Sequence, residues 1–333
     1  MTLARLTVIL RLRHSSFVIR HSSFVIPLPP MKPHLASLLT AAAMLLPSFA
    51  SAQQNSAPPD HYWVYFGTYT DTQVKGIYRS DFDPKGGKLS APQLAGESAS
   101  PSFLAVHPNG KLLYAINEIS NFEGKKTGGV GAFAIQKDGK LTLLNQAASG
   151  GVGPAHLAVD PTGKWLLVGN YGGGSTALLP IGADGKLGEA TSVVVHEAIK
   201  PQVSHAHWVG FSPDGKYGFV CDAGVDKIHQ FKIDAAKGAL VPNDPPAVAI
   251  GPGKGTGPRH LAFSTDHTHA YVINETNLTM TALKYDAAKG TFTALDTVST
   301  LPAGVENNKY STAEIVAHPN GKFVFGSNRT YDS

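Results

Sequence analysis

A motif that recurs about every 53 residues limits the folds open to this 333-residue chain more than any other feature. Each copy has an apolar run, a tight turn and a second apolar run that ends in Asn or Asp. The turn positions are spaced by 53, 52, 52 and 54 residues. A near-constant period of this length indicates repeated supersecondary units. The copies are residues 101–118, 154–171, 205–223, 258–275 and 312–329, with turn positions Gly110, Gly163, Gly215, His267 and Gly321.

The sequence predicts four short strands in each unit. In the second copy, residues 157–160 and 165–170 flank a Pro-Thr-Gly-Lys turn, and two further apolar runs cover residues 177–181 and 187–195. Four antiparallel strands in a unit of this length are typical of a β-propeller blade. A parallel β-helix is the structural alternative, but its repeats are shorter. Because long helical periodicity is absent after residue 62, we expect an all-β propeller with about five blades in this chain.

The N-terminal region reads differently from the repeats. Residues 13–26 contain the same heptapeptide twice, and we interpret residues 1–30 as a spurious extension. Residues 31–52 have the pattern of a signal peptide: Met31 and a lysine, an apolar stretch of about a dozen residues, and an Ala-Ser-Ala cleavage pattern. This pattern predicts an exported protein, periplasmic or secreted, with cleavage after Ala52. The apolar stretch is too short for a stable membrane anchor.

Residues 53–61 are expected to form a short linker and residues 62–333 the propeller domain. The last repeat stops at Ser333, just after its second strand. An open ring leaves exposed sheet edges, whereas a propeller normally closes by pairing its terminal strands. We therefore expect the domain to be truncated at its C-terminus.

Composition excludes some functions. The net charge of +4 is spread without basic runs, so the chain has no nucleic-acid-binding signature. A single cysteine, Cys221, excludes an internal disulfide and a cysteine-based metal cluster. Its place in an apolar run predicts a buried structural thiol. We expect no cofactor and no metal ion.

The repeat also works as an internal alignment of the polar residues. An Asn or Asp ends the second strand in every copy, which indicates a turn residue that bonds to local backbone. The following position varies, and two opposite charges there indicate a ligand-binding face. The strand-end residues are Asn117, Asn170, Asp222, Asn274 and Asn328, and the residues that follow are Glu118, Tyr171, Ala223, Glu275 and Arg329.

The first strand shows a similar contrast. His156, His207 and His260 are predicted to occupy one repeat position, with Phe103 and Glu314 in the other copies, and a histidine repeated in register favours a structural role. At the preceding position Arg259 stands out, because the other copies hold Ser102, Ala155, Ala206 and Ala313. His205 and His207 lie two residues apart, on one face of a strand.

Counting residues across each hairpin predicts that these side chains lie on one face of the propeller, near its axis. This is where the first strand of each unit begins and the second strand ends, and we call it the mouth. The count sets Arg259 opposite Asn274, beside Glu275, and sets His207 opposite Asp222. Two arginines, carboxylates and a histidine pair can bind an anionic substrate and supply a general base and an oxyanion clamp. The alternative is that they form salt bridges between blades.

At these positions the chain resembles the lactonase family of seven-bladed propellers, which includes bacterial 6-phosphogluconolactonases and fungal carboxy-muconate lactonising enzymes. The resemblance runs from residue 65 to the terminus and implies seven blades in the complete protein. It implies a site formed by His205 or His207, Arg259, Glu275 and Arg329. The motifs that carry it are Tyr-Phe-Gly-Thr-Tyr-Thr at 65–70, Gly-Asn-Tyr-Gly-Gly-Gly-Ser at 169–175, Ser-His-Ala-His at 204–207, Gly-Pro-Arg-His at 257–260, Asn-Glu at 274–275, Ala-Glu-Ile at 313–315 and Ser-Asn-Arg at 327–329.

These observations predict a metal-independent lactone hydrolase of carbohydrate metabolism, 6-phosphogluconolactonase-like, that opens a sugar-acid lactone with water. Two alternatives remain: a muconate-type lactonising cycloisomerase, and a non-catalytic exported binding propeller. A metal-dependent lactonase through the histidine pair and Glu275 lacks an obvious third ligand. The predicted catalytic residues are Glu275, His207, His205 and Arg259, and the predicted substrate-binding residues are Arg329, Arg259, Glu314, Asn170 and Tyr171.

Overall fold

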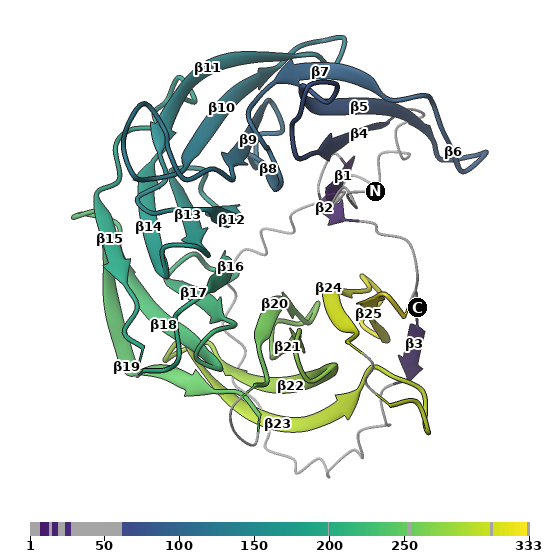
Figure 1. Ribbon diagram of the computed structural model, residues 1–333, viewed down its shortest axis with the longest axis vertical. Coiled ribbons are helices and arrows are strands. Elements are labelled where there is room, and N and C mark those ends of the chain that lie inside the picture. The colour runs from purple at the N-terminus through teal and green to yellow at the C-terminus, as the bar shows by residue number, and fades with distance from the viewer. Residues whose placement is uncertain are drawn as a thin grey trace, which may run out of the picture.

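The computed structural model describes residues 62–198, 200–251, 255–306 and 309–331, and the backbone of three short strands before residue 28. These parts of the chain contain no helix, and their strands form antiparallel sheets arranged around a common axis (Figure 1). Five sheets have at least four strands, and a sixth is partial. The all-β propeller predicted from the repeat is therefore confirmed.

Each sheet is built mainly from consecutive strands. The first contains β4 (Tyr62–Gly67), β5 (Gly76–Asp83), β6 (Lys88–Leu89) and β7 (Gln93–Glu97). The second contains β8 (Leu104–Val106), β9 (Leu112–Asn117), β10 (Gly129–Ile135) and β11 (Leu141–Ala148), and the third β12 (Pro154–Val159), β13 (Trp165–Asn170), β14 (Ser175–Pro180) and β15 (Ser192–Val195). The fourth contains β16 (Ala206–Phe211), β17 (Tyr217–Asp222), β18 (Lys227–Asp234) and β19 (Ala239–Ala249), and the fifth β20 (Pro258–Phe263), β21 (His269–Asn274), β22 (Thr279–Asp286) and β23 (Thr291–Ser299). The sixth contains β24 (Ser311–Ala317) and β25 (Phe323–Arg329).

Three short N-terminal strands extend the terminal sheets. β1 (Thr7–Leu12) pairs with β2 (Ser15–Val18) and with β4, and β3 (Phe24–Pro27) pairs with β25. The interpretation of residues 1–30 as a spurious extension stays a prediction. The predicted signal peptide and linker, residues 31–61, lie outside the described residues. Within the described part of the chain, no helix is long and apolar enough to cross a membrane.

The turn that defines the repeat has the same backbone in every copy. The residue at the turn position donates its amide to the carbonyl three residues earlier, as Gly163 does to Asp160 at 3.0 Å. All five turn residues have positive φ, between 58° and 73°, which explains the glycines. His267 also adopts this left-handed conformation, with a φ of 58°. Because it has a side chain, it does so at a steric cost that glycine avoids.

A β-bulge lies at the start of the innermost strand and changes the predicted register. Pro258 pairs with Asn274 and His260 pairs with Ile273, so Arg259 is an extra residue between paired positions. In the fourth sheet Ala206 pairs with Asp222, and the bulged residue is His207. The prediction that Arg259 faces Asn274 and His207 faces Asp222 is therefore wrong by one residue.

The bulge also corrects the internal alignment. Counted from the turn position, Trp208 is the counterpart of His156 and His260. His207 is the counterpart of Arg259, and Ala206 of the proline before it. The prediction that His207 shares a position with the other two histidines is wrong, because it relied on residue identity instead of backbone pairing.

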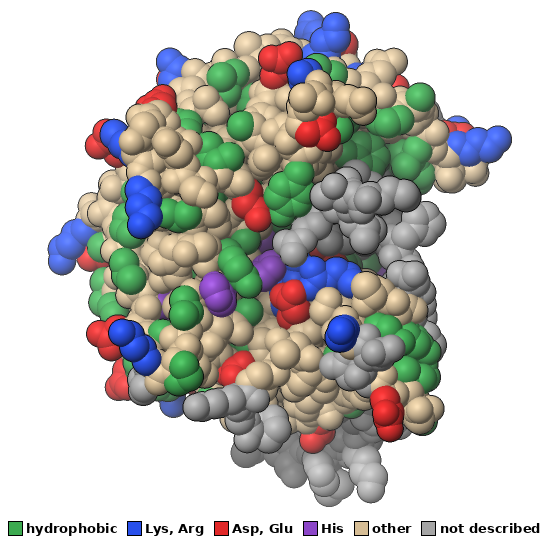
Figure 2. Space-filling model, viewed as in Figure 1, with side chains coloured by type: hydrophobic (Ala, Val, Ile, Leu, Met, Phe, Trp, Pro, Cys, Tyr) green, Lys and Arg blue, Asp and Glu red, His purple; other side chains and the backbone are tan. Residues whose placement is uncertain are grey.

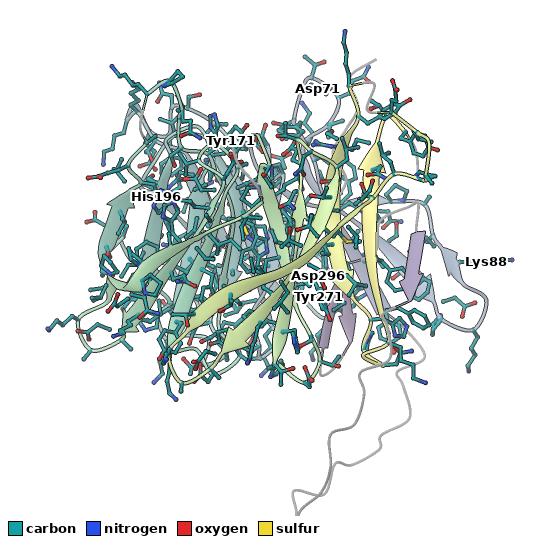
Figure 3. The ribbon with its side chains drawn as sticks, turned by 90° about the horizontal axis from the view of Figure 1, so that it is seen from below. Asp71, Lys88, Tyr171, His196, Tyr271 and Asp296 are labelled. Atoms are coloured by element: carbon teal, nitrogen blue, oxygen red, sulfur yellow. The ribbon has the colours of Figure 1, made fainter. Side chains whose placement is uncertain are left out.

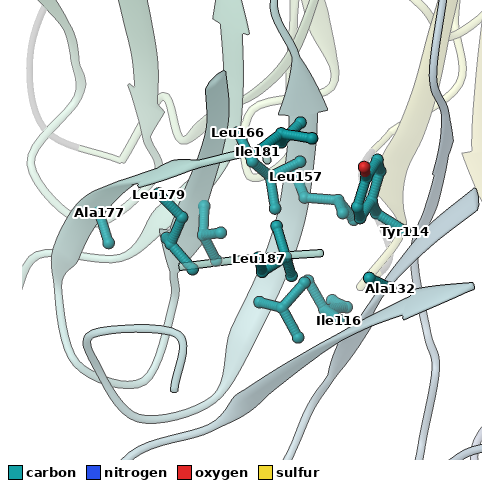
Figure 4. Packing of buried hydrophobic residues seen from close by; sticks show 11 residues of the cluster. Tyr114, Ile116, Ala132, Leu157, Leu166, Ala177, Leu179, Ile181 and Leu187 are labelled. Atoms are coloured by element: carbon teal, nitrogen blue, oxygen red, sulfur yellow. The ribbon is translucent and has the colours of Figure 1, made fainter. Parts of the chain in front are cut away.

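The hydrophobic core is divided among the interfaces between neighbouring sheets. In one such cluster, Tyr114 and Ile116 of β9 pack with Leu157 of β12 and Leu166 of β13 (Figure 4). Similar clusters join the other adjacent sheets. Each sheet therefore depends on its neighbours for the burial that stabilises it, as is general for repeat folds.

The Asn or Asp at the end of each second strand is buried and bonded to nearby chain. Asn117 donates to the Ala99 carbonyl at 2.7 Å, and Asn328 donates to the Thr300 carbonyl at 3.0 Å. Asp222 accepts from the His205 amide at 2.8 Å. These bonds confirm the predicted scaffold role of the strand-end position.

Candidate active site

Glu275 lies at the centre of a charged cluster at the mouth. It directly follows β21, and its Oε2 is 3.3 Å from Nε of Arg259. Its Oε1 accepts a hydrogen bond from a guanidinium NH2 group of Arg329, at the end of β25. The Arg259 side chain is 3% exposed, whereas those of Glu275 and Arg329 are 25% and 29% exposed. One arginine is thus fixed inside the protein, while the other and the carboxylate remain accessible from solvent.

The bulges of two neighbouring sheets direct His207 and Arg259 to the same carboxylate. Nε2 of His207 is 3.9 Å from Oε2 of Glu275, and the imidazole is almost fully buried. Arg259 also donates from a guanidinium NH group to the Ala313 carbonyl at 2.5 Å. The structure therefore brings together four of the predicted site residues, His207, Arg259, Glu275 and Arg329, which we call the Glu275 cluster. Figure 2 shows histidine, basic and acidic side chains close together in the hollow near the centre of the propeller face.

His205 and Tyr171 form the rim beside this cluster. Their rings stack with centroids 4.3 Å apart, and Tyr171 meets His207 edge to face at 5.5 Å. Nδ1 of His205 is within hydrogen-bond distance, 3.1 Å, of the Tyr171 carbonyl. Tyr171 is exposed and lies at one face of the disc in Figure 3. Of the two candidate histidines, only His207 forms an ion-pair contact with Glu275.

Glu314 pairs with His260 and does not belong to the Glu275 cluster. Its Oε1 is 2.9 Å from Nδ1 of His260, and this histidine also contacts the rings of His207 at 5.1 Å and His156 at 5.3 Å. Burial, together with the neighbouring His260, holds the pKa of His156 well below its usual value. The imidazoles of His156, His260 and His207 therefore form a chain of ring contacts beside the Glu275 cluster. The predicted substrate contact of Glu314 stays a prediction.

Asn170 is fully buried and holds the backbone around the glycine loop at residues 172–174. Its amide donates to the Ser149 carbonyl at 2.9 Å and to Oγ of Ser175 at 3.2 Å. Asn117 and Asn328, the strand-end residues of the second and sixth sheets, likewise donate to a backbone carbonyl. Its predicted role as a substrate contact is untested.

A second histidine pair lies outside the mouth. The rings of His196 and His229 stack with centroids 4.1 Å apart, and Nε2 of His229 is 3.2 Å from Oδ2 of Asp222. Burial and the adjacent His229 lower the pKa of His196 to about 3. Burial raises the pKa of Asp222, but hydrogen bonds from His229 and Ser204 outweigh this and lower it to about 2. The network holds the segment before His205 in place.

Cys221 is fully buried in β17, as predicted, and burial raises the pKa of its thiol well above the usual value. A thiol in this state is a poor nucleophile. In the described part of the chain, no three His, Cys, Asp or Glu side chains are arranged to hold a metal ion.

A shallow groove of about 690 Å³ lies next to the rim. It is lined by the glycine loop at residues 172–174 and by residues that include His196, Lys200 and Ser204. No member of the Glu275 cluster lines it. The charged cluster, not this groove, is therefore the candidate site.

A second polar pair lies at the mouth. The sequence analysis included Glu118 in the expected ligand-binding face but gave neither Glu118 nor Ser102 a specific role. Counted from the turn position, Ser102 and Glu118 of the second sheet are the counterparts of Arg259 and Glu275. Ser102 lies before β8, and Glu118 follows the strand-end residue Asn117. The Ser102 hydroxyl donates to Oε2 of Glu118 at 2.5 Å, and the Tyr69 hydroxyl donates to the same oxygen at 2.7 Å. Tyr69 precedes the first repeat copy, so the repeat could not identify it.

The fold and its mouth define the chain as a β-propeller with a charged axial cluster. A family model described as a lactonase with a seven-bladed β-propeller matches residues 63–333. The chain belongs to this lactonase family.

Several relatives match most of the chain. A 6-phosphogluconolactonase of Bacillus subtilis is 33% identical over 277 residues, which cover 82% of this chain and 76% of the relative. The solved structure of a periplasmic gluconolactonase from Pseudomonas aeruginosa is 30% identical, with a TM-score of 0.73, over 81% of this chain and 76% of that one. A Bacteroides fragilis structure is 34% identical, with a TM-score of 0.72, over 81% and 75% of the two chains.

Proposed function

We propose that the chain is a lactone hydrolase that opens a sugar-acid lactone with water at the Glu275 cluster. The observation that carries this proposal is the convergence of Arg259, Arg329 and His207 on the carboxylate of Glu275. Relatives named 6-phosphogluconolactonase and gluconolactonase support the substrate class. Export of the mature protein is part of the proposal, and the relative named periplasmic supports it.

The proposed reaction needs a placed water and stabilisation of a developing oxyanion. His207 or Glu275 removes a proton from water, which attacks the lactone carbonyl carbon. Arg259 and Arg329 bind the carbonyl oxygen and any anionic group and stabilise the negative charge on the tetrahedral intermediate. The intermediate then collapses, the bond to the ring oxygen breaks, and the protonated base returns its proton to that oxygen. The product is an open-chain hydroxy acid.

The structure favours His207 over His205 as the histidine that takes part. His207 lies within 3.9 Å of the Glu275 carboxylate, which can orient its ring and stabilise the imidazolium. His205 instead stacks on Tyr171 and contacts a backbone carbonyl. We therefore assign His205 to the rim.

A kinetic comparison of single variants tests this proposal. On glucono-1,5-lactone, His207→Gln and Glu275→Gln should each lower kcat/KM by about 10²-fold or more, which is the usual effect of removing a general base. His205→Gln should lower it by less than about tenfold, through changed substrate contacts. The proposed assignment is abandoned if the His205 variant loses far more activity than the His207 variant. Product analysis on a muconate-type diacid separates the cycloisomerase alternative, and loss of activity with a chelator would indicate a metal.

A further inference from the structure

Two repeat positions lie at the mouth: the position of Arg259, which is bulged in the third to fifth sheets, and the position that follows the strand-end Asn or Asp. Each sheet from the second to the sixth contributes one residue at each position. Only two of these five pairs combine two polar side chains that contact each other, Arg259 with Glu275 and Ser102 with Glu118. The first belongs to the proposed catalytic cluster, whereas the second has no role in the reaction so far described. The pairs are Ser102 and Glu118, Ala155 and Tyr171, His207 and Ala223, Arg259 and Glu275, and Ala313 and Arg329.

Backbone geometry supports the equivalence of Glu118 and Glu275. The Glu118 amide donates to the Ser100 carbonyl at 3.0 Å, and the Glu275 amide donates to the Gly257 carbonyl at 2.7 Å. Both residues directly follow the second strand of their sheet. Those strands, β9 and β21, lie on opposite sides of the axis in Figure 1. The end of β9, which Glu118 follows, therefore lies across the axis from the end of β21, which Glu275 follows.

The two carboxylates differ in their partners. Glu275 is compensated by two arginines, but no Lys, Arg or His in the described residues forms an ion pair with Glu118. Glu118 is bound instead by two neutral hydroxyls, of Tyr69 and Ser102, and both donate to Oε2. No hydrogen bond from a described residue reaches Oε1. The hydroxyls fix the orientation of a half-buried carboxylate and leave one of its oxygens as an acceptor.

We infer that Glu118, oriented by Tyr69 and Ser102, is a subsite for the hydroxyl groups of a polyhydroxylated lactone, an inference that rests on the proposed function. A carboxylate oxygen is a strong acceptor for hydroxyl donors and repels phosphate or carboxylate groups. The opposite side of the mouth holds the arginines, which suit the carbonyl and any anionic group. The substrate therefore lies across the axis, with its carbonyl at the Glu275 cluster and its hydroxylated carbons at Glu118. A subsite built to bind a hydroxyl discriminates strongly against a molecule that lacks it.

Two lactones with the same ring size test the subsite. Glucono-1,5-lactone carries the hydroxyls, and δ-valerolactone has none. In the full chain, Glu118→Ala should lower kcat/KM for glucono-1,5-lactone by about 10- to 100-fold, as expected for the loss of a charged acceptor. The rate on δ-valerolactone should stay within about twofold of wild type, because that substrate never uses Glu118. Glu118→Gln should recover part of the loss, because its amide oxygen still accepts a hydrogen bond, and Tyr69→Phe should give a smaller loss in the same direction.

The controls separate this subsite from folding and from the proposed function. Glu97→Gln changes an exposed carboxylate of β7 outside the mouth and should leave both rates unchanged. An equal loss on both lactones in Glu118→Ala means that Glu118 is structural, and no loss on either also refutes the subsite. If the wild-type chain hydrolyses neither lactone above the uncatalysed rate, the proposed function fails and the subsite fails with it. Hydrolysis of both lactones by wild type, with no selective loss in the variant, refutes only the subsite.

Discussion

Replacement of Arg259 should separate its role in stability from its role in catalysis. Its guanidinium donates to the Ala313 carbonyl at 2.5 Å, and its Nε lies 3.3 Å from the Glu275 carboxylate. A hydrogen bond from a charged donor contributes about 1.5–3 kcal/mol to stability. The ion pair has a gross attraction of roughly 5 kcal/mol at an effective dielectric constant near 20. The cost of burying the guanidinium cancels a large part of that attraction.

The expected net effect of Arg259→Met is therefore a loss of about 2–4 kcal/mol in the free energy of unfolding. The carboxylate of Glu275 keeps Arg329 as a partner, so the variant leaves no isolated buried charge. The kcat/KM for glucono-1,5-lactone should fall by about 10²–10³-fold, the usual effect of removing one oxyanion donor. Arg259→Lys keeps the charge but cannot make both contacts in the same geometry, so its losses should be smaller in both measurements.

Denaturant unfolding and steady-state lactone hydrolysis measure the two effects, and Arg79→Met is the matched control. Arg79 is also largely buried, 3.7 Å from Asp81 and stacked over Trp63 at 5.8 Å, but it lies in β5 outside the Glu275 cluster. The control should lose stability and keep its kcat/KM. The reasoning is refuted if Arg259→Met keeps kcat/KM within about threefold of wild type, or if both variants lose activity equally at a temperature where both are folded.

Four further outcomes follow from the fold, its titrating groups and the sequence. His267→Gly should raise the free energy of unfolding by about 0.5–1 kcal/mol because it removes a side chain from a left-handed turn, and an unchanged or lower melting temperature would contradict this. Leu166→Ala, at the interface of the second and third sheets, should cost about 2–5 kcal/mol in denaturant unfolding, and a cost near zero would mean that the cluster does not hold the sheets together. His196 is neutral in the folded chain down to a pKa of about 3 but is protonated below about 6.5 when unfolded, so stability should fall as pH falls through this window. His196→Gln should reduce that fall, and parallel pH–stability curves would exclude the histidine as its source. N-terminal sequencing of the exported protein should begin after Ala52, and a mature chain that retains residues 1–30 would exclude the predicted signal peptide.

The fold could be predicted because its local signals agree with one another. The turn glycines need positive φ, and the strand-end residues bond to local backbone, so both leave a mark in the sequence at a fixed spacing. Each blade repeats these marks. The spacing therefore predicted the sheets without any knowledge of long-range contacts.

The sequence predicted which residues form the candidate site, but it did not predict which residues face one another across each hairpin. Arg259 was identified as a departure from small residues in the sister repeats, and it does contact Glu275. His207 was aligned with His156 by identity, whereas its true counterpart is Arg259. A bulge adds one residue without a strong sequence signal, so counting across the hairpin was in error by one position. Tyr69 could not be identified, because its contact with Glu118 joins two sheets and depends on tertiary structure.

The bulge gives this propeller a modular means of changing what it binds. The innermost strands β12, β16 and β20 each present one residue outside the regular pairing, and β24 presents two, so these side chains can be exchanged without moving the ladder or the hydrophobic interfaces. Two of these places hold alanines, Ala155 and Ala313, next to sheets that already carry functional groups. Ala155 is partly exposed and its side chain is small. An engineer could therefore introduce an acid, an amide or a ring there and redirect ligand selectivity one blade at a time, while the rest of the framework stays as it is.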